Sequence, residues 1–555
     1  MPRSAARAAR LLLWPLALVP LLGACAGGDD TAPELVVTSP VRGSIADGTT
    51  VTVTGQVRDD GGTVRVTVAG VEAPVAADGS FAATVEVGAG IDVIETLATD
   101  AAGNQTRDVR AVLAGELVPV ATPVGDALAA RVGPAALHTV GEIVGDTVDG
   151  MDLAATARAL NPIYSTGGSC LGVDVSFLDL QKSDVAVSLA PVPGALATGV
   201  RIDDVVIDLR ADYKLACLGG SSHVTVRADQ VRVTGDLGLG VTGGDLHAAI
   251  AGLSVQIDNL DVDASGVPDA VFDLFSGTIE RKVEEAIEGA IADAVPGLVE
   301  ATLADLTSRA FVVPALGRDV SVQVRPTTVT IDAGGAFVAL DGTLGVAGGD
   351  GAVYLASPAR ASAGMMGADG GFGVALADDT LNQAFAGMWA SGALDLGVDL
   401  ERGHPLQLVL GDRARRVDVA MALPPTVTVG PEGGLRVMIG DAILHLRDAD
   451  GVEVATIALS LATTLDAEPG DRIRLALGAP EVFAQVLTQA ADQPPFTGPQ
   501  LEDLVGTLFG LMGPMIDDVI GAVPMPTIAG ATVANPGVSS RDGFVVVRGD
   551  LAAAP

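Results

Sequence analysis

Residues 268–306 read PDAVFDLFSGTIERKVEEAIEGAIADAVPGLVEATLADL, and this stretch predicts one long helix. Apolar residues recur in it at strict four-residue spacing: Val271, Phe275, Ile279, Val283, Ile287, Ile291, Val295, Val299 and Leu303. An α-helix advances about 100° per residue, so a four-residue step overshoots a full turn by about 40°. The apolar stripe therefore spirals around the helix, and a flat partner would cover only part of it. A strongly curved sheet wrapped around the helix would cover nearly all of it.

Two neighbouring features bear on this helix. Pro296 lies inside it and predicts a kink or a split, because proline lacks the backbone N–H and clashes with the preceding turn. A plain helical bundle is the alternative, but about ninety residues of alternating strand pattern, from Val173 to Val262, precede the helix. We therefore favour a helix wrapped by a sheet.

The order of elements repeats in the second half of the chain. Residues 123–160 show helical spacing before the first set of strands, and residues 378–391 do so between later ones. Strands are expected at 319–346, 394–400, 406–410, 417–423, 426–429, 435–446, 452–465 and 543–551. A second long helix begins at a capping box, Thr497 to Gln500. Helix, strands and long helix thus occur twice, as a pseudo-repeat of about 220 residues.

The first 25 residues have the pattern of an export signal. Arg3, Arg7 and Arg10 precede an apolar run, 11–22, that is too short to span a bilayer as a helix. The run ends in Leu-Gly-Ala-Cys25, which resembles a bacterial lipobox. Acyl chains on Cys25 would anchor the protein, since each buried CH₂ contributes about 0.8 kcal/mol. We expect an outer-membrane-anchored lipoprotein of the cell envelope; the alternative is an ordinary secretory signal with an incidental cysteine.

The next segments are a tether and a small all-β domain. Residues 26–33 form the tether, and residues 34–115 show short alternating strands separated by Asp-Gly and Gly-Gly turns. This pattern predicts a β-sandwich. The segment resembles the bacterial immunoglobulin-like repeats of surface proteins, including the closing sequence from Ala98 to Asn104. Such a module is most often a spacer.

Composition and charge limit the functional classes. The 555 residues are 49% hydrophobic and 18% charged, which suits large cores and excludes a disordered chain. The formal net charge of −37 opposes capture of nucleic acid or of anionic lipid surfaces. We expect no nucleic-acid partner.

The two cysteines after Cys25 are Cys170 and Cys217. In an oxidising compartment an even pair predicts a disulfide, here closing a loop of about 47 residues. Such a bond would add about 4 kcal/mol of stability in the chain-entropy model. Two separately buried thiols are the alternative.

Catalytic and metal-binding motifs do not emerge from the sequence. The five histidines are scattered, and no HExxH, GxSxG or P-loop pattern is present. Residues 261–266 begin like a calcium loop, but its twelfth position is Phe272 where a bidentate glutamate is needed. We expect no catalytic residues, no metal and no cofactor, and therefore not an enzyme.

Several short sequence segments resemble the bactericidal/permeability-increasing protein family of tubular lipid-binding proteins. They are residues 274–306, 381–394, 424–435 and 524–546. The resemblance implies an α+β fold of two elongated barrels, 116–330 and 331–555, which meet at a shared central sheet and each hold phospholipid tails in an apolar tunnel. Two departures matter. The family's disulfide joins a strand to the long helix, which has no cysteine here, and its cationic tip is missing, so endotoxin killing is not expected.

The function predicted is therefore binding of phospholipid or another acylated lipid, with transfer between membranes as a further expectation. Aliphatic walls with adaptable methionines suit acyl chains. The side chains expected to contact lipid are Val271, Leu274, Phe275, Ile279, Val283, Ile287, Leu381, Phe385, Met388, Trp389, Leu508, Met512 and Met515. The alternative is a non-enzymatic structural or interaction lipoprotein in which the same residues fill solid cores.

Overall fold

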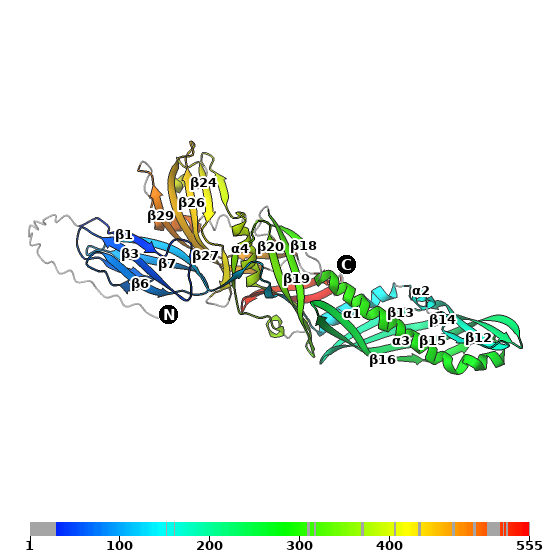
Figure 1. Ribbon diagram of the computed structural model, residues 1–555. Helices are drawn as coiled ribbons and strands as arrows, with labels where there is room; N and C mark the ends of the chain where they lie inside the picture. Colours follow the sequence, from blue (N-terminus) through cyan, green and yellow to red (C-terminus); the bar gives the residue numbers. More distant parts are fainter. Residues whose placement is uncertain are drawn as a thin grey trace, which may run out of the picture.

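The computed structural model describes residues 29–555 with short gaps. The gaps are 151, 160, 308–310, 316–317, 368–370, 404–406, 431–433, 469–471, 492–495, 508–521, 525–526, 529–530 and 554–555. Cys25, Leu508, Met512 and Met515 lie outside the described residues. The molecule is elongated, with the N-terminal β-domain at one end and a long sheet with helices at the other (Figure 1).

The N-terminal domain is a β-sandwich. Its first sheet has the order β1 (Glu34–Ser39), β3 (Thr50–Arg58), β6 (Ser80–Glu86), and its second the order β2 (Ser44–Ile45), β8 (Gln105–Ala114), β7 (Gly90–Thr99), β4 (Arg65–Val68), β5 (Val71–Ala73). Alternate residues point into the space between the sheets, where Val53, Val66 and Val112 are at most 1% exposed. The predicted all-β domain is confirmed.

We call the sheet at the opposite end the distal sheet. Its strands are β11 (Tyr164–Thr166), β12 (Leu171–Gln181), β13 (Asp184–Val192), β14 (Ala195–Leu215), β15 (Leu218–Thr242), β16 (Asp245–Asp258) and β17 (Asp261–Asp263). All its pairings are antiparallel. The two longest strands skip Asp204 and Asp229 in their register, and Asp204 has a φ of 51°. Such irregularities bend a strand pair, and the sheet curves into a half-barrel.

Three helices pack on the distal sheet: α1 (Pro134–Asp149), α2 (Leu153–Arg158) and α3 (Asp269–Thr307) (Figure 1). The long helix predicted from four-residue spacing is confirmed as α3. Of the two effects expected of Pro296, the split does not occur, because α3 continues through this residue as one element; the kink stays a prediction.

The prediction of a helix from residue 123 was wrong at its start. Residues Val124–Val132 form β10, which pairs with β20 (Gly335–Val346) on one side and β22 (Phe372–Ala377) on the other. These partners lie about two hundred residues away, and their ladder of hydrogen bonds outweighs local spacing. The helix begins only at Pro134, in the first turn where proline is tolerated.

A central sheet joins remote parts of the chain. Its order is β18 (Phe311–Ala315), β19 (Arg318–Asp332), β20, β10, β22, β33 (Phe544–Ala553), β32 (Ala531–Arg541), β31 (Thr527–Ile528). Beside it, β9 (Glu116–Pro119) pairs with β21 (Val353–Ala356), and η1 (Ala363–Met366) packs nearby. The sheet buries Ala129, Ala375 and Val546 without exposure.

A third large sheet, the C-terminal sheet, lies between the central sheet and the N-terminal domain. It comprises β23 (Leu396–Asp399), β24 (Arg416–Met421), β25 (Thr426–Val429), β26 (Leu435–Arg447), β27 (Glu453–Glu468), β28 (Arg472–Leu477), β29 (Glu481–Gln489) and β30 (Ala522–Pro524), with α4 (Asp378–Ala390) and α5 (Gln407–Leu410). The strand expected at 406–410 was wrong, since Gln407–Leu410 form one helical turn.

The second long helix is described over residues 498–507. The Thr497 backbone N–H donates to Gln500 Oε1 at 3.0 Å, which is the glutamine half of the predicted capping box. No helix among the described residues has the length and apolar character needed to cross a membrane.

Strands make up 58% of the structure and helices 16%, so the fold is mostly β, and the helices are the smaller part of it. Long-range pairing forms a strand at β10, where a helix was predicted, and at β22 and β32, where no element was predicted. One half-barrel sheet is present, and a pair of closed barrels is not confirmed.

Candidate lipid-binding seam along α3

The first turns of α3 are anchored in the core of the distal sheet. Val271 and Phe275 are 0% and 1% exposed and pack with apolar residues of β12, β14 and β15. The rings of Phe272 and Phe275 meet edge to face, with centroids 5.5 Å apart. The Tyr164 hydroxyl donates to the Leu274 carbonyl oxygen at 2.8 Å. This end of the helix is therefore fixed, and of the predicted contact residues Val271 and Phe275 are core.

Further along α3 the apolar side chains are only partly shielded from solvent. Ile287 and Ile291 are half-buried, although they pack against the same apolar cluster. Three inward residues of β16 are also half-buried, while their direct partners on β15 are at most 2% exposed. These pairs are Ile250 with Leu237, Val255 with Val233 and Ile257 with Val231. We call this line of half-covered apolar side chains the α3–β16 seam: Ile250, Leu253, Val255, Ile257, Ile287 and Ile291.

The last turns of α3 reach the central sheet. Val295 packs against a buried cluster that contains Leu137 of α1, Leu237 of β15 and Ile331 of β19. The seam is thus bounded by a solid core at each end. It remains half-covered between them.

Helix α1 packs on β13, at the edge of the distal sheet away from β16. Two glycines that were not predicted from the sequence make this contact. A Cβ added at Gly141 would lie 2.7 Å from the Val187 carbonyl oxygen, and one at Gly145 would lie 3.1 Å from that of Val185. Because these glycines lie one turn apart on one face, the helix backbone rests directly on β13. The two glycines lie four residues apart in a predicted helix, and this spacing could have indicated close packing of the helix.

The Gly141→Ala variant is expected to lower the free energy of unfolding by about 1–3 kcal/mol, since the new methyl group must displace α1 from β13. Gly289→Ala in α3 is the matched control, because a Cβ there meets no atom within 4 Å. Alanine should stabilise that helix by up to about 1 kcal/mol. Urea denaturation of both variants checks this. Equal effects of the two substitutions would contradict the close packing of α1.

The four predicted contact residues of α4 do not form one site. Leu381 and Phe385 pack with Val427 and other residues of the C-terminal sheet, whereas Met388 and Trp389 pack beside β19 and β20. The indole N–H of Trp389 donates to the Met421 carbonyl oxygen at 2.8 Å. These side chains fill two separate clusters, and their contact with lipid stays a prediction. Of the side chains of Ile279 and Val283, nothing is described.

The disulfide between Cys170 and Cys217 is present, with a sequence separation of 47. It ties the start of β12 to the turn between β14 and β15. The prediction of this bond is confirmed, and the alternative of two free thiols is wrong.

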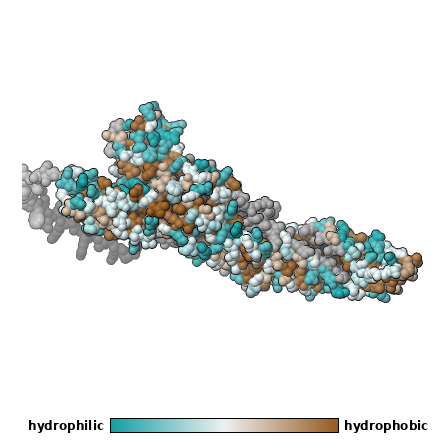
Figure 2. All heavy atoms as spheres, viewed as in Figure 1, coloured by the Kyte–Doolittle hydropathy of each residue, from teal (hydrophilic) through white to brown (hydrophobic). Residues whose placement is uncertain are grey.

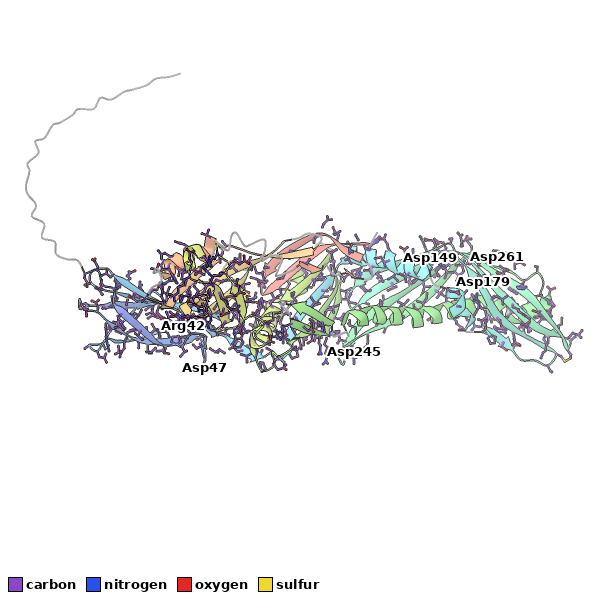
Figure 3. All side chains as sticks on the ribbon, turned by 90° about the horizontal axis from the view of Figure 1, so that it is seen from above. Arg42, Asp47, Asp149, Asp179, Asp245 and Asp261 are labelled. Carbon is purple, nitrogen blue, oxygen red and sulfur yellow. A yellow bond between two sulfur atoms is a disulfide. The ribbon has the colours of Figure 1, made fainter. Side chains whose placement is uncertain are left out.

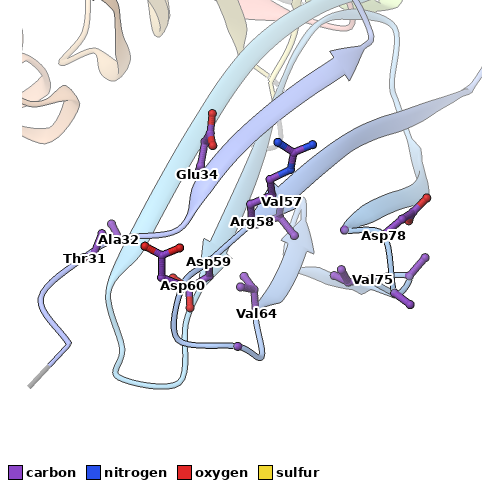
Figure 4. A pocket seen from close by; sticks show the side chains of 14 residues that line it. Thr31, Ala32, Glu34, Val57, Arg58, Asp59, Asp60, Val64, Val75 and Asp78 are labelled. Atoms are coloured by element: carbon purple, nitrogen blue, oxygen red, sulfur yellow. The ribbon is translucent and has the colours of Figure 1, made fainter.

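A cavity of about 570 Å³ lies in the N-terminal domain, far from the seam (Figure 4). Its walls include Glu34, Arg58, Asp59, Asp60 and Asp78, so it is polar and mostly acidic. The sequence did not predict it, because the lining side chains come from three separate turns and strand ends.

An acidic cluster lies beside this cavity. Carboxylate oxygens of Asp29, Asp59 and Asp100 lie within 4.8 Å of one another. Asp100 accepts hydrogen bonds from the Gly103 and Asn104 backbone N–H groups and from the Asn104 side chain. Burial opposes these bonds, but together they lower the pKa of Asp100. Its carboxylate is thereby used in closing the turn.

Two buried carboxyl groups begin α4. Asp378 and Asp379 are 4% and 7% exposed. Burial, and then the neighbouring Asp379 carboxylate, raise the pKa of Asp378 to about 7. Burial also raises the pKa of Asp379, whose Oδ2 accepts from the Ser357 N–H at 2.9 Å. The folded protein therefore holds a proton here more tightly than the unfolded chain does.

A raised pKa gives stability that is present at about pH 4 and is lost as the pH rises through about 7. Asp378→Asn mimics the protonated form, so we expect it to match the parent near pH 4. At pH 8 it should exceed the parent by up to about 4 kcal/mol. Denaturation curves at both pH values measure this difference. Asp47→Asn, at an exposed position, is the control, and a difference for Asp378→Asn that does not change with pH would contradict the expectation.

The geometry defines a class: an elongated, mostly β protein in which a long helix is seated on a half-barrel sheet behind an N-terminal sandwich. Residues 33–115 match the family described as glucodextranase, domain B. The crystal structure of a lipopolysaccharide binding protein is similar at 15% sequence identity, over 77% of this chain and 99% of that chain, with a TM-score of 0.42. No curated protein matches the sequence.

Proposed function

We propose that this protein binds an acylated lipid, such as a phospholipid, along the α3–β16 seam. The observation that carries the proposal is a difference in exposure between two paired strands of the distal sheet, β15 and β16. Val231, Val233 and Leu237 on β15 are at most 2% exposed, whereas their inward partners on β16 stay half-covered. A hydrocarbon chain laid along β16 would complete this cover.

The energetics favour such an occupant. Two 16-carbon tails lose about 25 kcal/mol of favourable transfer free energy when exposed to water, at about 0.8 kcal/mol per CH₂. The seam offers Ile, Leu and Val side chains along two long elements, which suits a long flexible chain. Contacts of this kind tolerate different tail lengths, so the proposal names the acyl chain and not one headgroup.

The proposal extends to location and mode of action. Acylation of Cys25 would anchor the protein in the outer membrane of a cell envelope, and lipid transfer between membranes would follow from lipid binding there. The role is non-catalytic. The resemblance of residues 274–306 and 381–394 to tubular lipid-binding proteins supports this direction.

Val255→Glu should reduce lipid binding about tenfold, because it places a charge in the seam where the acyl chain would lie. Ser254→Glu is the matched control, since Ser254 is the exposed, outward-facing neighbour on the same strand. Native mass spectrometry of the purified protein, before and after incubation with phospholipid vesicles, measures the bound lipid. Equal loading of both variants would place any lipid elsewhere.

A structural or interaction lipoprotein with solid cores is the second candidate. The observation in its favour is the position of the 570 Å³ cavity, which is polar and lies in the N-terminal domain. The same mass measurement separates the two functions. Protein that is free of lipid as purified and takes up none from vesicles supports the second candidate.

A further inference from the structure

The end of the distal sheet farthest from the N-terminal domain is apolar. Among the described residues, Leu218 has the highest exposed fraction of the large apolar side chains, 75%, and Leu171 is 45% exposed. Figure 2 shows apolar surface gathered at this end, and Figure 3 shows the disulfide there as a yellow bond. We call residues 166–172 and 215–222 the distal tip.

The distal tip differs in charge from the rest of the chain. Its two segments read TGGSCLG and LACLGGSS and contain no charged residue, although 18% of the whole sequence is charged. The first flanking charge on β14 is the exposed Lys214, beyond which Asp212 pairs with Arg210 at 2.9 Å. A hairpin end that is exposed only to water would be expected to carry charged residues in a protein of net charge −37.

The tip also holds a strained backbone. Ala216 and Cys217 form the two-residue turn between β14 and β15, and both have positive φ, 50° and 66°. Glycine and asparagine adopt this turn readily, whereas alanine and cysteine do so at a cost of about 1 kcal/mol or more each. The bond to Cys170, and the Cys217 N–H donated to the Cys170 carbonyl oxygen at 3.3 Å, hold the turn in place. The result is a fixed turn that presents Leu218 to the outside.

From these observations we infer that the distal tip docks on a lipid bilayer surface by shallow insertion of Leu171 and Leu218. This inference rests on the proposed function, for which it supplies the membrane contact. A protein partner fits less well, because a stable interface buries roughly 800 Å² on each side and the tip offers two leucines on a narrow end. The half-buried ring of Tyr213 lies against Gly220 just behind the tip, and aromatic side chains of this kind favour the membrane interface.

Neutral lipid headgroups are the surface that the charge favours. The net charge of −37 repels anionic bilayers, and the uncharged tip brings no cationic cluster to offset that repulsion. Docking should therefore be strongest on phosphatidylcholine vesicles and insensitive to salt, since it depends on apolar insertion.

The test is vesicle flotation of the chain from residue 26 onward, which lacks both the apolar export signal and the acyl attachment site. The double variant Leu171→Ser/Leu218→Ser should bind phosphatidylcholine vesicles about tenfold or more weakly. Leu396→Ser is the matched control, because Leu396 is 54% exposed on another sheet. All three residues are exposed, so the melting temperature should not change.

The inference is overturned by no binding of the parent chain, by equal binding of the tip variant, or by an equal loss in Leu396→Ser. Binding only to anionic vesicles overturns it as well, because charge would then be the cause. The bound lipid is measured separately by native mass spectrometry. A chain that docks through the tip but carries no lipid leaves the tip inference standing and removes the proposed function.

Discussion

Replacing Arg42 by alanine is expected to lower the free energy of unfolding by about 3–5 kcal/mol, because it leaves a buried charge without its partner. The buried charge is that of Asp441, 1% exposed, whose Oδ1 accepts from Arg42 Nη1 at 2.9 Å. Its Oδ2 accepts from the Ala111 N–H at 2.9 Å and the Gly43 N–H at 3.2 Å. Burial raises the pKa of Asp441, and these donors oppose that rise.

Chemical denaturation of the variant and the parent at neutral pH measures the loss. Arg436→Ala is the control, since Arg436 pairs at 3.2 Å with Glu481 at the surface and its loss should cost less than about 1 kcal/mol. The double variant Arg42→Ala/Asp441→Asn should recover part of the stability, because the uncompensated charge is removed. A loss at Arg42 as small as that at Arg436 would show that the ion pair does not hold the two parts together.

The ion pair belongs to an interface that fixes the N-terminal domain on the C-terminal sheet. Figure 3 shows Arg42 at this junction. Apolar residues of both parts pack there: Ile91, Ala111, Leu113, Leu423, Met438 and Ala462. Arg42 also donates to Gln485 Oε1, and Arg107 pairs with Glu502 at the start of the second long helix. The N-terminal domain, a module of a kind that is most often a spacer, is therefore docked on the C-terminal sheet.

This interface could not be predicted from the sequence, for a physical reason. Arg42 and Asp441 are separated by 399 positions, and Asp441 reaches the interface from an irregularity in β26 where its φ is 44°. Neither spacing nor composition encodes a contact between two surfaces that each look solvated. The N-terminal sandwich itself was predictable, because strand alternation and turn residues are local signals.

The candidate site shows the same difference between local features, which were predictable, and long-range contacts, which were not. The four-residue spacing that starts at Val271 predicted both the α3 helix and its contact with a curved sheet, and the disulfide followed from the compartment and the cysteine count. The half-cover of Val255 and Ile257 was not predictable, because it depends on how far α3 lies from the edge of the sheet. Strands such as β10 were missed since their partners come from remote segments.

The residue with the second large expected effect is Gln383, at the centre of α4. Its side chain is fully buried, at 0% exposure, and makes three hydrogen bonds to backbone groups of other segments. Its Oε1 accepts from the Leu344 N–H at 2.6 Å, and its Nε2 donates to the carbonyl oxygens of Val120 and Thr122 at 2.8 and 2.9 Å. One glutamine thus fixes β20 and the segment leading into β10 against α4.

Gln383→Leu should lower the free energy of unfolding by about 3–5 kcal/mol, because leucine has similar volume but removes the side-chain partner of the Leu344 N–H and of the Val120 carbonyl oxygen, both on half-buried residues. The carbonyl oxygen of the exposed Thr122 keeps the Tyr354 hydroxyl as a donor at 3.2 Å. Gln256→Leu on β16 is the control, since that glutamine is exposed and its loss should cost less than about 0.5 kcal/mol. Denaturation with urea measures both. The central sheet joins strands from both halves of the chain, so the loss at Gln383 should appear as one transition at lower urea. Two separate transitions, or a loss no larger than at Gln256, would mean that α4 is held by its apolar contacts alone.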